Sequence, residues 1–211
     1  MRIGILGSGR MGAALGQQWA AVSHSVTFSY SRDPRRLKGL AHASGGNARA
    51  GSPAEAVAAS DVVLVAVPWH RLDDALAQSG SLAGKIVVTC SVPMTEDDSD
   101  LAVGHTSSGA EELAKRLADA RVVAAFNTIP SELIVDPDRL SRPVRPEVVY
   151  CGDDAAAKEV VADLIRDTGF EPVDAGPLRV ARWMDPFALL VAQLAYEMDL
   201  GPEMGYRFLR S

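Results

Sequence analysis

The residues with the clearest chemical meaning come first in the chain, as the glycine-spaced loop G-S-G-R-M-G at positions 7–12. The loop follows a short apolar run and opens a helical pattern, which is the setting of a dinucleotide-binding fingerprint. In such a loop the first glycine permits a tight turn, the second lets a pyrophosphate approach the backbone, and the third allows close helix–strand packing. The helix that follows would offer its N–H groups and positive dipole end to the phosphates. We therefore predict a dinucleotide site at Gly7, Ser8, Gly9, Arg10, Met11 and Gly12.

The residues after the second expected strand indicate which dinucleotide is bound. An acidic residue about 20 positions beyond the glycines usually holds the free 2′-hydroxyl of NAD. This chain instead has Ser31 and Arg32, with Arg36 about one turn further on. A hydroxyl and guanidinium groups suit a 2′-phosphate, whereas Asp33 precedes Pro34 and is interpreted as a helix cap. The sequence thus predicts NADP bound by Ser31, Arg32 and Arg36; for Arg36, an exposed helix position is the competing interpretation.

Further candidates lie where central strands of the predicted sheet end, the edge at which open α/β sheets place ligands. Pro68 cannot continue a strand ladder, so the strand before it should stop there. Asn127 offers a donor and an acceptor and suits a nicotinamide carboxamide or the edge of a flavin-like ring. His70 is either a pocket residue or an exposed residue at a helix start. The expected reacting end comprises Ala66, Val67, Pro68, Trp69, His70, Pro93, Asn127, Thr128, Ile129 and Pro130, with His70 and Asn127 as the pocket candidates for catalysis.

Missing motifs narrow the reaction class. The sequence contains no nucleophile elbow, no metal-ligand spacing and no glycine-flanked helical lysine of the β-hydroxyacid dehydrogenase type. Carbonyl reduction usually needs a proton donor, whereas hydride exchange between two cofactors needs mainly proximity, orientation and exclusion of water. The interpretation is an NADP-dependent oxidoreductase without an assigned catalytic side chain. A protein that senses NADP(H) without turnover is an alternative from another class.

The elements that must position these residues alternate between strand and helix patterns, which is typical of a parallel sheet covered on both faces. Continuous apolar runs at 62–67, 86–90 and 122–126 predict strands buried on both faces. Ser52 and Ser108 each precede a glutamate by three positions, the spacing of a capping box that begins a helix. We predict a Rossmann-type doubly wound parallel sheet with a small C-terminal α/β extension.

The segment 130–146, with its four prolines and three arginines, is the expected linker between two domains. An NADP-binding domain is predicted at 1–130. A small domain at 131–211 would complete the second-cofactor pocket and provide a dimer interface. Its expected elements are strands at 148–151 and 170–174, a helix at 154–168, and a long apolar helix from about 178 to 200, which Pro186 should kink or divide.

Composition bounds the partners and the compartment. The formal charge of −6, from 21 basic and 27 acidic residues, argues against nucleic acid or an anionic membrane as a general partner. The partners expected are small-molecule cofactors. Cys90 and Cys151 form no disulfide framework and are expected in buried strands. We expect no signal peptide and no membrane-spanning segment. The protein is therefore expected to be cytoplasmic.

Taken together, these residues and several later motifs resemble the F420-dependent NADP oxidoreductase family. The matching motifs are G-S-G-R-M-G, Ser31-Arg32, A-V-P-W at 66–69, N-T-I-P at 127–130, C-G-D-D at 151–154 and D-A-G-P-L at 174–178. The resemblance extends over essentially the whole chain. It implies hydride exchange between NADP(H) and the deazaflavin coenzyme F420. It also implies that the deazaflavin lies between the A-V-P-W turn, the T-I-P turn and the C-terminal helix, and that the protein is a homodimer.

One position departs from the family pattern. Members best characterised as deazaflavin enzymes tend to have histidine where this chain has Asn127. The Phe126-Asn127 pair is more similar to related nucleotide-binding domains that serve flavin-dependent metal reductases. An NADPH-dependent flavin reductase, using FMN or FAD, or a ferric reductase on the same scaffold is therefore the alternative function.

Overall fold

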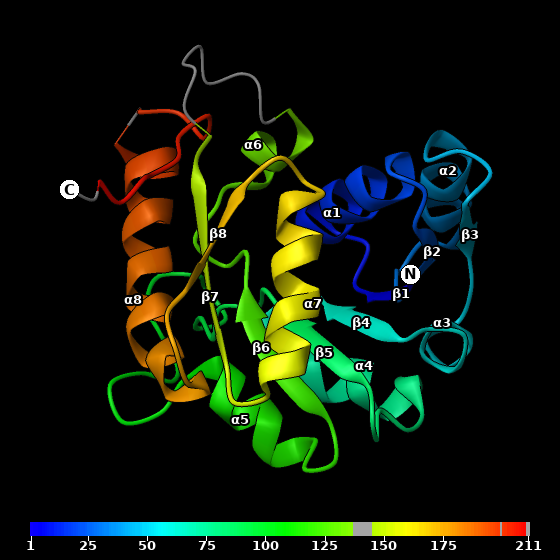
Figure 1. The fold of residues 1–211 in the computed structure, drawn as a ribbon, viewed down its shortest axis with the longest axis horizontal. Helices are drawn as coiled ribbons and strands as arrows, with labels where there is room; N and C mark the ends of the chain where they lie inside the picture. The colour runs from blue at the N-terminus through cyan, green and yellow to red at the C-terminus, as the bar shows by residue number, and fades with distance from the viewer. Residues whose placement is uncertain (137–144, 199, 210–211) are drawn as a thin grey trace.

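The computed structural model describes residues 1–136, 145–198 and 200–209. Within them, eight strands form a single sheet in the order β3-β2-β1-β4-β5-β6-β7-β8, which crosses the molecule in Figure 1. Neighbouring strands are parallel except β6 and β7, which are antiparallel. The predicted fold class is confirmed. The strands are β1 (Arg2–Leu6), β2 (Ser25–Ser29), β3 (Ala48–Ala50), β4 (Val62–Val65), β5 (Ile86–Thr89), β6 (Arg121–Ala125), β7 (Glu147–Gly152) and β8 (Glu171–Asp174).

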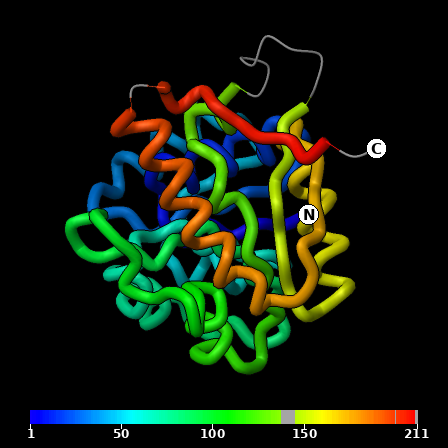
Figure 2. Tube along the Cα trace, turned by 90° about the vertical axis from the view of Figure 1, so that its left-hand side faces the viewer, coloured from blue at the N-terminus to red at the C-terminus, as the bar shows by residue number. Residues whose placement is uncertain are grey.

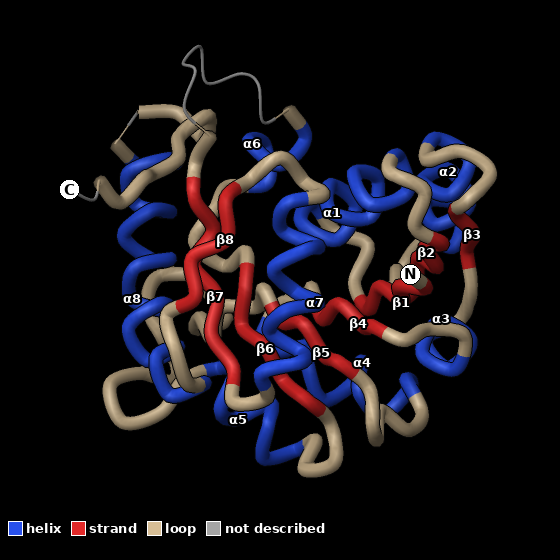
Figure 3. Tube along the Cα trace, viewed as in Figure 1, coloured by secondary structure: helices blue, strands red, loops and turns tan. Residues whose placement is uncertain are grey.

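Helices cover both faces of this sheet (Figure 3) because the side chains of each strand alternate between two apolar cores. Ile5 of β1 packs in the core that contains Trp19 of α1. Leu6, the next residue, packs in the core that contains Leu113 of α5. The helices are α1 (Arg10–Ala21), α2 (Pro34–Ala43), α3 (Pro53–Ala58), α4 (Leu72–Ser79), α5 (Gly109–Arg116), α6 (Ser131–Val135), α7 (Ala155–Arg166) and α8 (Ala181–Ala192).

Local capping signals fix where several helices begin. The Asp33 side chain accepts a hydrogen bond from the backbone N–H of Arg35 at the start of α2, so its predicted role as a cap is confirmed. Ser52 and Glu55 form the predicted capping box of α3. Ser108 caps α5 in a similar way, accepting from the N–H of Glu111. That helix ends at Arg116, because the backbone of the next residue, Leu117, leaves the helical region.

The C-terminal part continues the same sheet through β7 and β8, with α7 between them. The long helix expected from 178 to 200 is three consecutive pieces: a 3₁₀ turn at Leu178–Val180, the helix α8, and a π-helical turn at Gln193–Glu197. The prediction for Pro186 was a kink or a division of the helix; α8 continues through Pro186, so the division does not occur. The buried face of α8, which includes Met184 and Ala188, holds the helix against the protein. No helix in the described ranges is long and apolar enough to cross a bilayer.

The end of the chain returns across the molecule and packs beside β7 (Figure 2, red segment). The backbone N–H of Glu147 donates to the carbonyl oxygen of Tyr206 over 2.9 Å. The Tyr206 hydroxyl lies 2.6 Å from Oγ1 of Thr128, directly after β6. Thus the C-terminal segment supports the turn after β6. The middle of the predicted linker, residues 137–144, which include Arg139 and Arg142, lies outside the described residues.

Candidate functional site

The glycine loop contains two glycines that the fold requires and one that it does not. At Gly7, φ is +104°, and an added Cβ would lie 2.3 Å from the carbonyl oxygen of Ala66. At Gly12, an added Cβ would lie 1.9 Å from the carbonyl oxygen of Gly7. At Gly9, which is exposed, an added Cβ would meet no atom within 4 Å. No described atom packs against the position of a side chain at Gly9, so its backbone at the N-terminus of α1 is accessible to a ligand.

Contacts to the end of β2 hold this loop in place. The backbone N–H of Gly7 and the hydroxyl of Ser8 both donate to the carbonyl oxygen of Ser29, over 3.2 and 3.0 Å. From the first turn of α2, Arg36 donates through Nε to the carbonyl oxygen of Ser8 over 2.9 Å. Arg36 therefore has a structural contact at one guanidinium nitrogen, and its role toward a 2′-phosphate stays a prediction.

The turn that follows β2 presents the other two predicted phosphate ligands. Ser31 Oγ accepts from the backbone N–H of Asp33 over 3.2 Å, and Arg32 is exposed. Tyr30, just before them, has φ of +57° and donates from its hydroxyl to Asp74. Burial, and then the bond to Asp74, raises the pKa of Tyr30 to about 12. The anchored Tyr30 fixes the direction in which Ser31 and Arg32 leave the strand.

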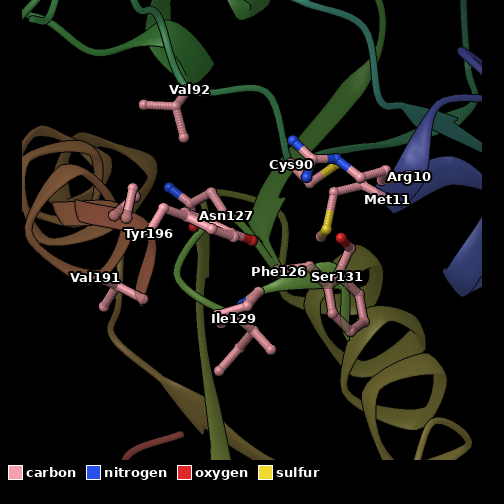
Figure 4. Close-up of a pocket in the computed structure, with 13 residues that line it drawn as sticks. Arg10, Met11, Cys90, Val92, Phe126, Asn127, Ile129, Ser131, Val191 and Tyr196 are labelled. Carbon is pink, nitrogen blue, oxygen red and sulfur yellow. The ribbon is translucent and has the colours of Figure 1, made fainter. Parts of the chain in front are cut away.

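A pocket of about 180 Å³ begins at the same end of α1 (Figure 4). It extends from the first two residues of α1, across the ends of β5 and β6, to α8 and the π-helical turn. The volume is below the roughly 300–1,000 Å³ of a typical drug-sized ligand site, so it would admit a ring rather than a dinucleotide. Its described lining is mostly apolar: Arg10, Met11, Cys90, Val92, Phe126, Asn127, Ile129, Pro130, Ser131, Ala188, Val191, Ala192 and Tyr196.

The pocket brings together some of the residues proposed from sequence and leaves others outside. Arg10 and Met11 meet Asn127, Ile129 and Pro130 in its wall. Its described lining does not contain the A-V-P-W turn, His70 or Pro93. Of these, His70 is exposed, and the Trp69 ring lies 5.6 Å from the Arg116 guanidinium. Pro93 is buried beside Gly109. Thr128, also predicted for the reacting end, is buried beside Tyr206.

Charged and aromatic side chains form one rim of the pocket. Arg10 lies 3.7 Å from the Glu132 carboxylate and 5.9 Å from the centre of the Tyr196 ring. Tyr196 in turn donates from its hydroxyl to Glu132 over 2.9 Å. The first residue of α1 is thus joined to α6 and to the π-helical turn. An anion at the glycine loop would lie next to Arg10 and would compete with Glu132 for it.

A buried aspartate behind the pocket was missed in the sequence analysis. Asp185 of α8 is 3% exposed. Its Oδ2 accepts from the backbone N–H of Gly109 over 3.0 Å, and its Oδ1 accepts from Nδ2 of Asn127 over 3.1 Å. Burial raises the pKa of Asp185 to about 6, although both hydrogen bonds act in the opposite direction. The available signal was a carboxylate at helical spacing within the apolar stripe that includes Met184 and Ala188.

The residue that Asp185 holds has an unsatisfied polar atom. Oδ1 of Asn127 is shielded from solvent and has no hydrogen-bond partner among the described residues. An acceptor left in this state costs about 1–3 kcal/mol. Phe126, immediately before it, is fully buried with φ of +65°, a conformation that is strained for a bulky side chain. Strain and unsatisfied groups concentrate at functional sites, and a donor on a bound ring would satisfy the Asn127 oxygen.

Comparison with known proteins connects this arrangement to a family. A family model described as NADP oxidoreductase, coenzyme F420-dependent, matches residues 2–93. The crystal structure of a candidate F420-dependent NADP-reductase from Arthrobacter sp. FB24 superposes on the whole chain with a TM-score of 0.89. It is 26% identical, and the match covers 100% of both chains. These comparisons support the F420-dependent NADP oxidoreductase family as the one that this chain resembles.

Two curated relatives of this chain carry the names of different reductases. The F420-dependent NADP reductase of Methanocaldococcus jannaschii is 30% identical over 146 residues, which are 66% of this chain and 64% of that protein. The metalloreductase STEAP3 of Rattus norvegicus is 33% identical over 189 residues, which are 89% of this chain but 36% of that protein. The matched part of this chain thus covers about a third of the rat protein and a little under two thirds of the Methanocaldococcus protein.

Proposed function

We propose that the protein transfers hydride between NADP(H) and the deazaflavin coenzyme F420. The observation that carries this proposal is the continuity of two sites at one end of α1. The exposed Gly9 backbone suits a pyrophosphate, and the ring-sized pocket begins at the next two residues, Arg10 and Met11. The two carriers supply the chemistry when bound: a hydride leaves C4 of the nicotinamide for the deazaflavin ring, and a proton from solvent completes its reduction.

The protein would contribute binding, orientation and exclusion of water. Gly9 and the first turn of α1 would hold the pyrophosphate, and Ser31, Arg32 and Arg36 the 2′-phosphate. The apolar wall made by Met11, Ile129 and the residues of α8 would exclude water from the reacting rings. Asn127 would accept a hydrogen bond from a ring edge or a carboxamide. The residues present therefore fit both NADP and a planar second carrier.

A second candidate is an NADPH-dependent reductase of a flavin, FMN or FAD, or of a ferric chelate. Two observations favour it: Asn127 stands where deazaflavin enzymes tend to have histidine, and the rat metalloreductase is similar over 89% of this chain. In that reaction the two electrons of one NADPH would reduce one flavin or, through it, two ferric ions. The same pocket would serve either ring, since deazaflavin and flavin share the same pyrimidine edge.

One assay separates the candidates. Purified protein is incubated with NADPH and, in separate reactions, with F420, FMN, FAD or a ferric chelate, and the loss of nicotinamide absorbance is followed. Turnover with F420 alone supports the main proposal, and turnover only with flavin or ferric chelate supports the second. Tight NADPH binding without turnover on any acceptor would overturn both and leave a sensor of NADP(H).

Three further proposals are separate from the reaction. Expression of each part would test the proposed division into domains at 1–130 and 131–211. Measurement of molecular size in solution would test the homodimer, and cell fractionation would test the cytoplasmic location.

A further inference from the structure

The hydrogen bond between Asp185 and Asn127 determines which group of the asparagine is left for a ligand. An asparagine side chain can present either its NH₂ group or its oxygen, and neighbouring groups select the orientation. Here Nδ2 donates to the Asp185 carboxylate over 3.1 Å. A carboxylate cannot donate to the amide oxygen, so the reverse orientation would leave two acceptors facing each other. The amide is thereby held with Oδ1 as its remaining group.

Asp185 is itself held firmly. It is 3% exposed, and its second oxygen accepts from the N–H of Gly109, the first residue of α5. That contact sets the carboxylate at the positive end of the α5 dipole, which stabilises its charged form. Asp185 therefore joins α8 to the start of α5 and the turn after β6, through residues that lie 76 and 58 positions earlier in the chain.

We propose that Asp185 is a positioning residue that makes Asn127 an acceptor in the pocket, matched to an N–H donor at the edge of a planar heterocycle. This inference rests on the proposed function, because it assumes that a carrier ring enters this pocket. Three observations support it: the satisfied contacts of Asp185, the unpartnered Oδ1 of Asn127, and the strained backbone of Phe126, which turns the chain from β6 toward α8. Two sources of the N–H are available, the nicotinamide carboxamide and the N3–H of a flavin or deazaflavin ring.

The decisive variants exchange the carboxylate and the amide. In Asp185→Asn the new amide competes as a donor, so the Asn127 amide can rotate and present NH₂ to the ligand. In the double variant Asp185→Asn with Asn127→Asp, an amide again donates to a carboxylate, and one carboxylate oxygen again remains as acceptor. Asp154→Asn is the matched control, because Asp154 also accepts a backbone N–H at a helix start, that of Ala157, without lining the pocket.

Two pairs of ligands, in which the members of a pair differ only in the N–H group, show which ligand donates to Asn127. The first pair is NADPH and its analogue with an acetyl group in place of the carboxamide; the second is the carrier that the wild type reduces and its N3-methyl derivative. We expect Asp185→Asn to raise the Kd or KM about tenfold for the N–H-bearing member of one pair, because the loss of one hydrogen bond weakens binding by about that factor. The analogue lacking the N–H should change less than about twofold, and the double variant should restore the N–H form.

A spectroscopic readout checks the geometry independently of turnover. The chain contains two asparagines, Asn47 and Asn127, so asparagine-selective ¹⁵N labelling gives two side-chain amide signals. The Asn127 signal, assigned by its loss in Asn127→Ala, should shift in Asp185→Asn and stay in place in Asp154→Asn. Each of these variants adds the signal of its own new asparagine, which is told apart from that of Asn127 by adding Asn127→Ala to the variant. The Asn47 signal should stay in place in both variants and so reports that the fold is intact.

The outcomes separate this inference from the proposed function. If no acceptor is reduced by the wild type but NADPH binds, hydride transfer fails while the NADPH pair still tests Asp185. If Asp185→Asn affects both members of each pair equally, or neither, Asp185 only shapes the pocket and the inference is overturned. Failure of the double variant to restore binding, with the Asn47 signal unchanged, also overturns it. Absence of NADPH binding by the wild type would overturn the inference and the proposed function together.

Discussion

Arg36 donates from Nε to the carbonyl oxygen of Ser8 over 2.9 Å, so a side chain of α2 holds the second residue of the glycine loop. A charge-assisted hydrogen bond of this kind contributes about 1.5–3 kcal/mol. Arg36→Ala should therefore loosen the loop under the pyrophosphate, a part that NADPH and NADH share. We expect the Kd of both cofactors to rise about tenfold or more, as measured by fluorescence titration. Arg36→Lys, which keeps a donor, should lose less. A larger effect on NADPH than on NADH would measure the proposed contact of Arg36 with the 2′-phosphate, and an effect confined to NADPH would show that the bond to Ser8 does not support cofactor binding.

Arg32 should act on the 2′-phosphate alone. It is exposed at the turn after β2, and among the described residues its side chain forms no hydrogen bond with the glycine loop, unlike that of Arg36. Replacing it by aspartate changes attraction for the phosphate into repulsion, so Arg32→Asp should raise the Kd of NADPH about 100-fold, close to 3 kcal/mol. The Kd of NADH should change less than about threefold. Equal weakening of both cofactors would contradict the assignment of NADP specificity to Arg32.

Substitution of two glycines of the loop by alanine should affect two different properties, stability for Gly12 and cofactor binding for Gly9. Gly12→Ala would force a Cβ to within 1.9 Å of the carbonyl oxygen of Gly7, so it should lower the free energy of unfolding by about 3 kcal/mol or more. Gly9→Ala meets open space, and its stability should stay within about 0.5 kcal/mol of the wild type. The same change places a methyl group where the pyrophosphate would approach, and the Kd of NADPH should rise at least about tenfold. Thermal unfolding and cofactor titration measure the two effects separately.

Asp185 should leave a signature in the pH dependence of stability. Burial raises its pKa from the ordinary 3.8 to about 6, a difference that corresponds to about 3 kcal/mol. Between these values the native protein keeps a proton that the unfolded chain has lost, so this group makes stability fall as pH rises from about 4 to 6. Above pH 6 its unfavourable contribution is complete, and below pH 4 it is absent.

The comparison of wild type with Asp185→Asn isolates this contribution. The variant should gain up to about 3 kcal/mol relative to the wild type between pH 4 and pH 7 in urea unfolding. The charged or titratable groups around Asp185 are Glu111 of α5, which favours its protonated form, and Cys151 of β7, whose thiol pKa burial raises to about 12. Arg182 pairs with Glu111. A stability difference that does not vary with pH would show that Asp185 is not the group that titrates.

Local signals in the sequence were sufficient for the frame of the molecule. Alternation of strand and helix, the apolar runs and the glycine loop identified a doubly wound sheet before its strands were placed. The caps at Asp33 and Ser52 were also readable, because each involves a side chain and a backbone N–H only two or three residues away. Such contacts form from the local sequence alone and need no knowledge of the rest of the fold. For Pro186 the sequence left a kink or a division of the helix open, because a local pattern does not reveal the buried face that holds α8 against the protein.

The tertiary structure alone decided how the site is assembled. Hydrogen bonds join Asp185 to Asn127 across 58 positions and Arg36 to Ser8 across 28, and no local pattern encodes either pairing. The pocket also depends on the return of α8 and the C-terminal segment beside β6 and β7, a packing that buries apolar surface from distant parts of the chain. The sequence by itself supplied the dinucleotide-binding fingerprint and made NADP the expected dinucleotide. Packing between distant elements decided that Asn127, rather than His70, lies in the wall of the adjoining pocket.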